Sequence, residues 1–302
     1  MFYLAVVSVV WAFSFGLTKV NLQGVDPFFI AAVRLLLALL VFLPFLRLRL
    51  LREWRLSVPL FFIGAVQYGL MYSALFSSYR LLDAHDVVLF TCFTPLYVTL
   101  LDDVETRRFH PAFFAAALAA AAGVALAGFH GDAAGARPHL AGFAVMQLSN
   151  LCFAWGQVRY RNLMARRGGG IRDRELFAVL YLGGFLAASI PAAAVAAGQG
   201  GSLWTAACAL TAAQAWTILY LGVLASGVCF FLWNVGARRT NTGTLAVFNN
   251  LKIPLGTACA LLLFGEKEAG VWRLVAGMAL ILASLALNEW HVRVRNRSGA
   301  AV

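Results

Sequence analysis

The stretch Phe248-Asn-Asn-Leu-Lys-Ile-Pro254 places three polar residues directly before a proline inside a long apolar run. An earlier stretch, Leu89-Phe-Thr-Cys-Phe-Thr-Pro95, aligns with it without gaps when the two prolines are matched, and the same alignment pairs Arg80 with Arg239. Two Ala- and Leu-rich segments could align through composition alone. Matched prolines and arginines at one spacing favour an internal duplication instead.

Outward from these prolines, polar interruptions divide the chain into apolar segments, most of them close to the about 20 residues that a helix needs to cross a bilayer. Helices are expected because lipid offers backbone N–H and C=O groups no hydrogen-bond partners. The sequence therefore predicts an all-α polytopic membrane protein. Its ten expected transmembrane helices cover residues 2–20, 28–46, 58–79, 86–101, 112–129, 140–158, 176–197, 213–236, 243–264 and 271–290.

The duplication divides these ten helices into two repeats of five. We expect one repeat at residues 1–130 and the second at 138–302, joined by a linker at 131–137. Trp11-Ala near the start of the first repeat matches Trp155-Gly in the second. Because five is odd, the second repeat enters the membrane upside down relative to the first, which is the inverted-repeat architecture of many secondary transporters.

The composition excludes several classes of protein. Of 302 residues, 62% are apolar and 12% are charged, so the chain lacks the polar surface of a soluble domain. The net charge of +11 comes from basic residues that punctuate apolar runs, which argues for membrane loops and against nucleic-acid binding. The five cysteines and five histidines show no metal-ligand spacing, and no phosphate-binding G-x-x-x-x-G-K-[ST] motif is present. We expect no metal and no cofactor.

The basic residues also predict the orientation in the membrane. Of the 24 Lys and Arg residues, 17 fall in loops on one side of the expected helices, four fall on the other side, and three lie within or at the end of a helix. Cytoplasmic loops carry the excess of Lys and Arg. We therefore expect a multi-pass protein of the cytoplasmic (inner) membrane with both termini in the cytoplasm.

Two prolines and one lysine are the first candidates for a transport pathway. Each mid-helix proline frees the carbonyl four residues before it, on Thr91 for Pro95 and on Asn250 for Pro254. This predicts either a kink relieved by neighbouring side chains or a hinge that lines a cavity. Lys252 shares a helix face with Asn249, and a lysine at this depth marks a functional site unless it reaches the interface along its flexible stem.

The remaining candidates come from several helices. Arg34 is expected either to be a structural partner of Asp26 or of a helix-end carbonyl, or to contact substrate, and Tyr181 stands at its rough equivalent in the second repeat. Gln147 and Asn150 belong to an amide stripe that predicts cavity lining or hydrogen bonding between helices. For the aromatic candidates Trp11, Tyr72 and Trp155, packing is the simpler interpretation of each alone. Phe90 and Phe93 are the repeat partners of Asn249 and Lys252 and would form an aromatic wall opposite them.

These residues also point to a family. The opening Trp11-Ala-Phe-Ser-Phe-Gly-Leu-Thr-Lys19, Pro27 and Arg34 in the second helix, and the stretch from Asn249 to Pro254 followed by Phe264-Gly-Glu266 resemble EamA-type members of the drug/metabolite transporter superfamily. The resemblance covers nearly the whole chain. It implies a ten-helix exporter or exchanger of small metabolites, often amino acids, with the substrate cavity between the repeats.

The sequence thus predicts a secondary transporter that works by alternating access. The expected substrate is a small carboxylate-bearing molecule, bound by Lys252 with Asn249, because the expected helices carry the cations Lys252 and Arg34 and no acidic residue at comparable depth. A neutral Lys252 that shuttles a proton is the rival interpretation. The alternative function is an intramembrane enzyme acting on a lipid-linked or anionic substrate. The sequence does not define the oligomeric state, and a monomer is compatible with it.

Overall fold

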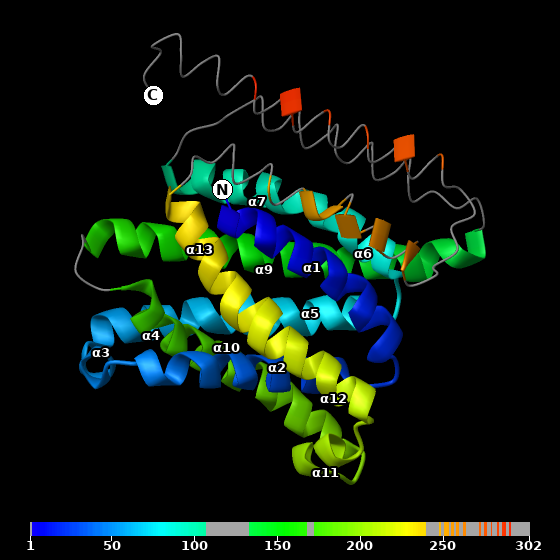
Figure 1. Cartoon of the computed structure of the whole chain (residues 1–302), viewed down its shortest axis with the longest axis horizontal. Helices are drawn as coiled ribbons and strands as arrows, with labels where there is room; N and C mark the ends of the chain where they lie inside the picture. Colours follow the sequence, from blue (N-terminus) through cyan, green and yellow to red (C-terminus); the bar gives the residue numbers. More distant parts are fainter. Residues whose placement is uncertain are drawn as a thin grey trace.

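The computed structural model describes residues 2–106, 133–167 and 172–239 continuously, together with some positions between 248 and 290. This part of the chain is helical and contains no strand, which confirms the all-α prediction (Figure 1). The expected helix at 112–129 lies outside the described residues, as do most positions of 243–264 and 271–290.

Within the described residues, six helical stretches are long and apolar enough to cross a membrane, so the chain is a multi-pass membrane protein. They agree within a few residues with six of the helices expected from the sequence, and the expected helix at 140–158 lies inside the longer α9 (Ala133–Arg167), which is not among the six. The six stretches are Phe2–Asn21, Pro27–Phe45, Trp54–Ser78, Asp86–Glu105, Asp173–Gly198 and Ala212–Gly236.

Several of these stretches are built from more than one helical element. The elements before α9 are α1 (Phe2–Asn21), α2 (Pro27–Phe42), η1 (Leu43–Phe45), α3 (Leu48–Arg52), α4 (Trp54–Gly64), η2 (Ala65–Leu70), α5 (Met71–Ser78), α6 (Ala84–Phe90), η3 (Thr91–Phe93) and α7 (Thr94–Thr106). Those after α9 are α10 (Asp173–Gly198), α11 (Leu203–Cys208), α12 (Ala212–Leu219), η4 (Tyr220–Val228) and α13 (Cys229–Arg239).

Two of the membrane helices in the described part of the chain contain a wide, π-helical turn. One is η2, between α4 and α5, and the other is η4, between α12 and α13. When Pro95 is aligned with Pro254, η2 falls opposite residues 224–229, which overlap η4. A wide turn inside an α-helix is uncommon and often marks a functional region.

The fourth membrane helix is broken where Pro95 predicts a disturbance. α6 ends at Phe90, the 3-10 turn η3 follows, and Pro95 occupies the first turn of α7, where its missing N–H is tolerated. Within the break the Thr94 N–H donates to the carbonyl of Thr91, and Asn150 of α9 donates its side-chain amide to the carbonyl of Phe90 at 2.8 Å. The Thr91 carbonyl is therefore satisfied within the broken helix and the Phe90 carbonyl by a neighbouring helix.

Close backbone contact fixes how the helices pack around α10. A Cβ atom on Gly64 would lie 1.8 Å from the Leu180 carbonyl oxygen, and one on Gly183 would lie 2.0 Å from that of Phe61. Only glycine fits at these two positions. This contact seats α10 against α4 and η2, while α2 packs on α10 as well, so elements from distant parts of the sequence interlock.

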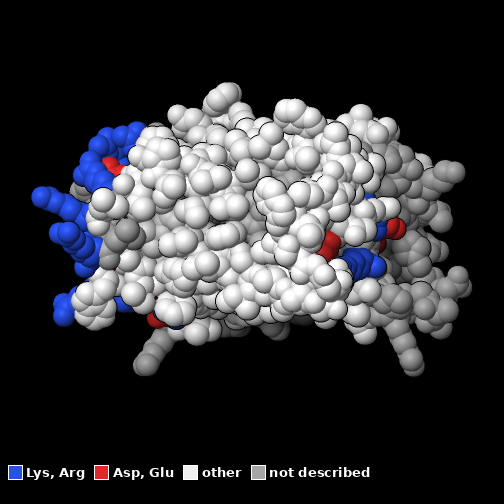
Figure 2. All heavy atoms as spheres, turned by 90° about the horizontal axis from the view of Figure 1, so that it is seen from below, with Lys and Arg blue, Asp and Glu red and all other residues white. Residues whose placement is uncertain are grey.

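The surface has the charge distribution of a membrane protein. Figure 2 shows Lys and Arg gathered at one end of the molecule, a broad uncharged middle on the visible face, and a smaller charged group near the other end. Exposed Arg47, Arg49 and Arg52 lie at the first end, where α2 is followed by α3. Large apolar side chains of the membrane helices, such as Phe62 of α4 and Ile190 of α10, are exposed, as expected for contact with lipid.

Candidate functional site

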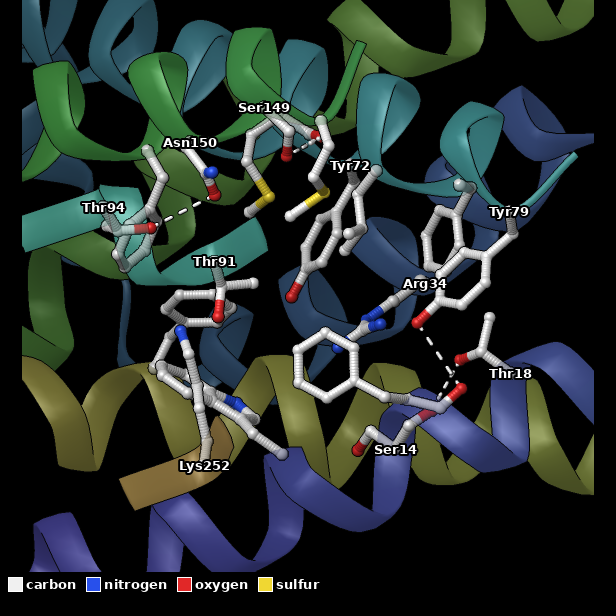
Figure 3. Close-up of a pocket in the computed structure, with 18 residues that line it drawn as sticks. Ser14, Thr18, Arg34, Tyr72, Tyr79, Thr91, Thr94, Ser149, Asn150 and Lys252 are labelled. Carbon is white, nitrogen blue, oxygen red and sulfur yellow. Dashed lines mark hydrogen bonds between the residues drawn. The ribbon is translucent and has the colours of Figure 1, made fainter. Parts of the chain in front are cut away.

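A cavity of about 80 Å³ lies among α1, α2, α5, α7, α9 and α13 (Figure 3). Its apolar wall is made by Trp11, Phe15, Met71, Leu75, Phe76, Met146, Phe153 and Phe230. Its polar lining is made by Ser14, Thr18, Arg34, Tyr72, Tyr79, Thr91, Thr94, Ser149, Asn150 and Lys252. Ligand pockets usually enclose about 300–1,000 Å³, so the walls must separate to admit a metabolite, and the unbranched Met71 and Met146 are suited to such repacking.

Arg34 presents a buried cation to this cavity from α2. Its guanidinium carbon lies 4.2 Å from the centroid of the Tyr72 ring, and its Nε donates a hydrogen bond to the Ser226 hydroxyl. Asp26, the structural partner that the sequence suggested, instead accepts hydrogen bonds from the backbone of Phe28 and Phe29 and pairs with Arg80. The expectation of an Arg34–Asp26 pair is therefore wrong.

Ser226 is the point where three helices converge on the wide turn η4. Besides Arg34, the Tyr72 hydroxyl lies 2.9 Å from Ser226 Oγ, and the Tyr181 hydroxyl of α10 donates to the Ser226 carbonyl at 2.7 Å. The sequence reasoning did not single out Ser226. The available signal was a hydroxyl residue within an otherwise apolar membrane helix.

Lys252 enters the cavity from the opposite side to Arg34, as Figure 3 shows. The side chain is buried, and its Nζ lies 5.6 Å from the centroid of the Trp11 ring, within the range of a cation–π contact. The Trp11 indole N–H donates to the Ala225 carbonyl at 2.9 Å. This bond orients the ring under the lysine, so Lys252 lies inside the bundle and does not extend to an interface.

Asn150 holds the broken helix at the cavity edge. Its Oδ1 accepts a hydrogen bond from the Thr94 hydroxyl at 3.1 Å, while its Nδ2 donates to the Phe90 carbonyl and to Gln147 Oε1, the latter at 3.1 Å. Because a carbonyl can only accept, these contacts fix which end of the amide faces Thr94. The Thr91 hydroxyl donates to the Val88 carbonyl at 2.7 Å.

The structure brings five of the predicted residues together around the cavity: Trp11, Arg34, Tyr72, Asn150 and Lys252. It does not bring Phe90, Phe93, Gln147 or Trp155 to the lining. Phe90 and Phe93 pack edge-on against Phe143, and Trp155 packs at the edge of the main core. Three further predicted residues, Asn249, Asn250 and Pro254, lie outside the described residues.

A second cavity of about 340 Å³ lies where α1 ends and α2 begins, beside the end of α5. It shares Thr18, Phe76 and Tyr79 with the first cavity, so these three side chains form the wall between them. Beside it, Lys19 pairs with Asp83 at 3.2 Å and donates to the carbonyls of Tyr79 and Leu82. This contact ties the end of α1 to the connection between α5 and α6.

No group of His, Cys, Asp and Glu residues able to hold a metal ion occurs in the part of the chain that the structure describes. A multi-pass helical bundle around an internal, partly polar cavity is the arrangement expected of a membrane transporter. Comparison with known proteins identifies the family of the chain. Residues 1–129 match the EamA-like transporter family.

Several relatives align with almost the whole chain. It is 39% identical over 297 residues to a probable biotin transporter of Pseudomonas aeruginosa, covering 96% of this chain and 97% of the relative. It is 36% identical over 305 residues to a biotin transporter of Salmonella typhimurium and 35% identical over 305 residues to that of Escherichia coli K12, covering 99% of this chain and 96% of each relative. A solved crystal structure with 18% identity shares the fold, with a TM-score of 0.62 and coverage of 98% of this chain and 99% of that chain.

The chain belongs to the EamA-like transporters of the drug/metabolite transporter superfamily. The family that the sequence suggested is therefore confirmed. The protein is a transporter and not the intramembrane enzyme that was the alternative from sequence.

Proposed function

We propose that this protein carries biotin across the cytoplasmic membrane through the cavity that contains Arg34 and Lys252. The observation that carries the proposal is the similarity, over at least 96% of the chain, to proteins named biotin transporters. Their names favour biotin over the amino acids that the family resemblance first suggested. The cavity supports the choice because it combines two buried cations with extensive apolar walls.

The chemistry of biotin suits this lining. Biotin has a carboxylate on a flexible apolar chain and a compact sulfur-containing ring system fused to a cyclic urea. A carboxylate transferred out of water requires a cation or several hydrogen-bond donors. The apolar body requires surfaces such as Trp11, Phe230 and Met146, which line the same cavity. One cavity therefore offers partners for both parts of the molecule.

Transport is proposed to occur by alternating access between two inverted repeats of five helices, at residues 1–130 and 138–302 with a linker at 131–137. The matching positions of η2 and η4 support this duplication. The cavity draws side chains from both proposed repeats, with Arg34 and Tyr72 from the first and Asn150, Phe230 and Lys252 from the second. A relative movement of the repeats would therefore change the cavity directly.

Reconstitution tests the substrate. Purified protein in liposomes is expected to move radiolabelled biotin down an imposed gradient at a rate well above that of protein-free liposomes. Excess unlabelled biotin should compete, whereas lysine or phenylalanine should not. Transport should be measured in both directions. Flux of amino acids without flux of biotin would contradict the proposed substrate.

The proposed orientation places both termini and the basic end of the molecule in the cytoplasm. In a variant without the five native cysteines, we expect a cysteine at Arg52 to be protected from a membrane-impermeant thiol reagent in intact cells, and one at Gly200 to react. Both positions are exposed in the structure. Opening the cells should make Arg52→Cys reactive as well, which controls for accessibility. The reverse labelling pattern would contradict the orientation.

A further inference from the structure

The guanidinium of Arg34 is positioned by two aromatic rings and one hydrogen bond. Its central carbon lies 4.2 Å from the centroid of the Tyr72 ring and 5.6 Å from that of the Phe76 ring, while Nε donates to the Ser226 hydroxyl. Within the described residues, the Arg34 side chain makes a single hydrogen bond, the one from Nε to Ser226. Its two terminal nitrogens therefore remain as donors at the cavity that Arg34 lines.

This cation has no acidic partner in the described part of the chain. Asp26, the N-cap of the helix that carries Arg34, is engaged by the α2 backbone and by Arg80. Arg34 is only 4% exposed, so solvent screens its charge poorly. A buried guanidinium is stabilised strongly by an anion, and its planar pair of terminal nitrogens matches the two oxygens of a carboxylate.

The other side of the cavity offers hydrogen-bond acceptors. The Thr91 hydroxyl donates its hydrogen bond to the Val88 carbonyl, and the Thr94 hydroxyl donates its hydrogen bond to Asn150 Oδ1. Each hydroxyl oxygen can therefore still accept a hydrogen bond from a ligand, but its single O–H is already used. Thr91 and Thr94 line the cavity on the same side as Lys252, which contributes a donor there (Figure 3).

Resting on the proposed function, we propose that the cavity fixes the orientation of its substrate. The carboxylate binds to the terminal nitrogens of Arg34. The two N–H groups of the cyclic urea donate to Thr91 and Thr94, and the urea oxygen faces Lys252. This assignment replaces the Lys252 carboxylate site expected from sequence. Arg34 offers two terminal nitrogens that match the two oxygens of a carboxylate, whereas Thr91 and Thr94 line the cavity on the side of Lys252 and accept hydrogen bonds from the urea. The substrate class is a monocarboxylate joined through an apolar spacer to a neutral cyclic urea.

Competition between biotin and its primary amide separates the two sides of the cavity, since the amide lacks only the negative charge. The wild-type protein is expected to prefer the acid by roughly 10- to 100-fold, the value of a charge-assisted hydrogen-bonded contact. Arg34→Gln should reduce this preference to about onefold while the affinity for the amide stays within about threefold, since only the carboxylate contact is lost. Arg34→Lys keeps the positive charge but loses the planar pair of terminal nitrogens, so its preference for the acid over the amide should be intermediate.

Lys252→Gln is the matched comparison, because it removes the other buried cation of the cavity. It should weaken the acid and the amide by similar factors and so leave their ratio unchanged, as should Thr91→Val. An unchanged ratio in both Arg34→Gln and Arg34→Lys, with loss of the ratio in Lys252→Gln, would transfer the carboxylate to Lys252 and overturn the inference. If Arg34→Gln does not fold, the acid-to-amide affinity ratio of Arg34→Lys decides: a reduced ratio supports the inference and an unchanged ratio contradicts it. Wild-type protein that binds neither compound would contradict the proposed function itself, and the orientation would fail with it.

Discussion

Replacing Gly64 by alanine is expected to leave little folded protein. The added Cβ would lie 1.8 Å from the Leu180 carbonyl oxygen and 2.5 Å from its carbonyl carbon. Both are backbone atoms of α10, so no side chain can rotate away and the two helices must separate. Overpacking usually costs about 1–3 kcal/mol, and a clash that only backbone movement relieves lies at or above the upper end. Size-exclusion profiles and the thermal midpoint of detergent-solubilised protein measure the effect.

Gly198→Ala is the matched control for this prediction. Gly198 ends α10, the same helix, yet a Cβ there meets nothing within 4 Å. Alanine favours helix over glycine by about 1 kcal/mol, so this variant should be as stable as the wild type or slightly more stable. A cost of about 3 kcal/mol would lower the thermal midpoint of a domain of 150–250 residues by roughly 6–12 °C. A thermal midpoint of Gly64→Ala within about 2 °C of the wild type would therefore show that the helices do not pack as described.

Asn150→Leu is expected to cause the second large loss of stability. Leucine has the same branching and number of side-chain heavy atoms as asparagine, but it removes the donor for the Phe90 carbonyl and the acceptor for the Thr94 hydroxyl. Each buried polar group left without a partner costs about 1–3 kcal/mol, so the two together cost several kcal/mol. The loss should appear in the thermal midpoint, and faster amide hydrogen exchange should be confined first to the region between α6 and α7.

Gln147→Leu provides the comparison one turn earlier on α9. Its Oε1 accepts from Asn150, but its buried Nε2 has no hydrogen-bond partner in the described part of the chain. Leucine removes this poorly satisfied group, so the lost hydrogen bond and the relieved burial should nearly cancel, within about 1 kcal/mol. Equal destabilisation by Gln147→Leu and Asn150→Leu would mean that general packing explains the effect, and not the hydrogen bonds of Asn150 to Thr94 and the Phe90 carbonyl.

The positions of the membrane helices could be predicted because hydropathy is a local property. Six expected helices agree with the structure within a few residues, and Pro95 marks the broken helix correctly. The wide turns η2 and η4 could not be predicted, since a π-helical turn leaves the apolar content of a segment unchanged. The packing of α10 against α4 is also not encoded in either helix alone, although Gly64 and Gly183 permit it.

The candidate site was predictable in part for a related reason. Charged or amide groups at membrane depth are conspicuous, so Arg34, Lys252 and Asn150 could be selected from the sequence. Their partners could not, because Ser226, Thr91 and Thr94 are small polar residues that commonly bond to their own helix backbone. Phe90 and Phe93 illustrate the opposite error. Repeat alignment predicted them as a cavity wall, but the 3-10 turn beside them brings Thr91 and Thr94 to the lining.

The wide turns η2 and η4 change the direction in which the following side chains point around the helix axis. A π-helical turn holds about one residue more than an α-helical turn, which rotates everything after it by roughly 100° around the helix axis. η2 directly precedes Tyr72 and Phe76, and η4 contains Ser226 and precedes Phe230. Deleting one residue from either turn would thus point an intact set of aromatic and hydroxyl side chains at lipid, whereas the same deletion in the exposed connection at 199–202 would leave their direction unchanged.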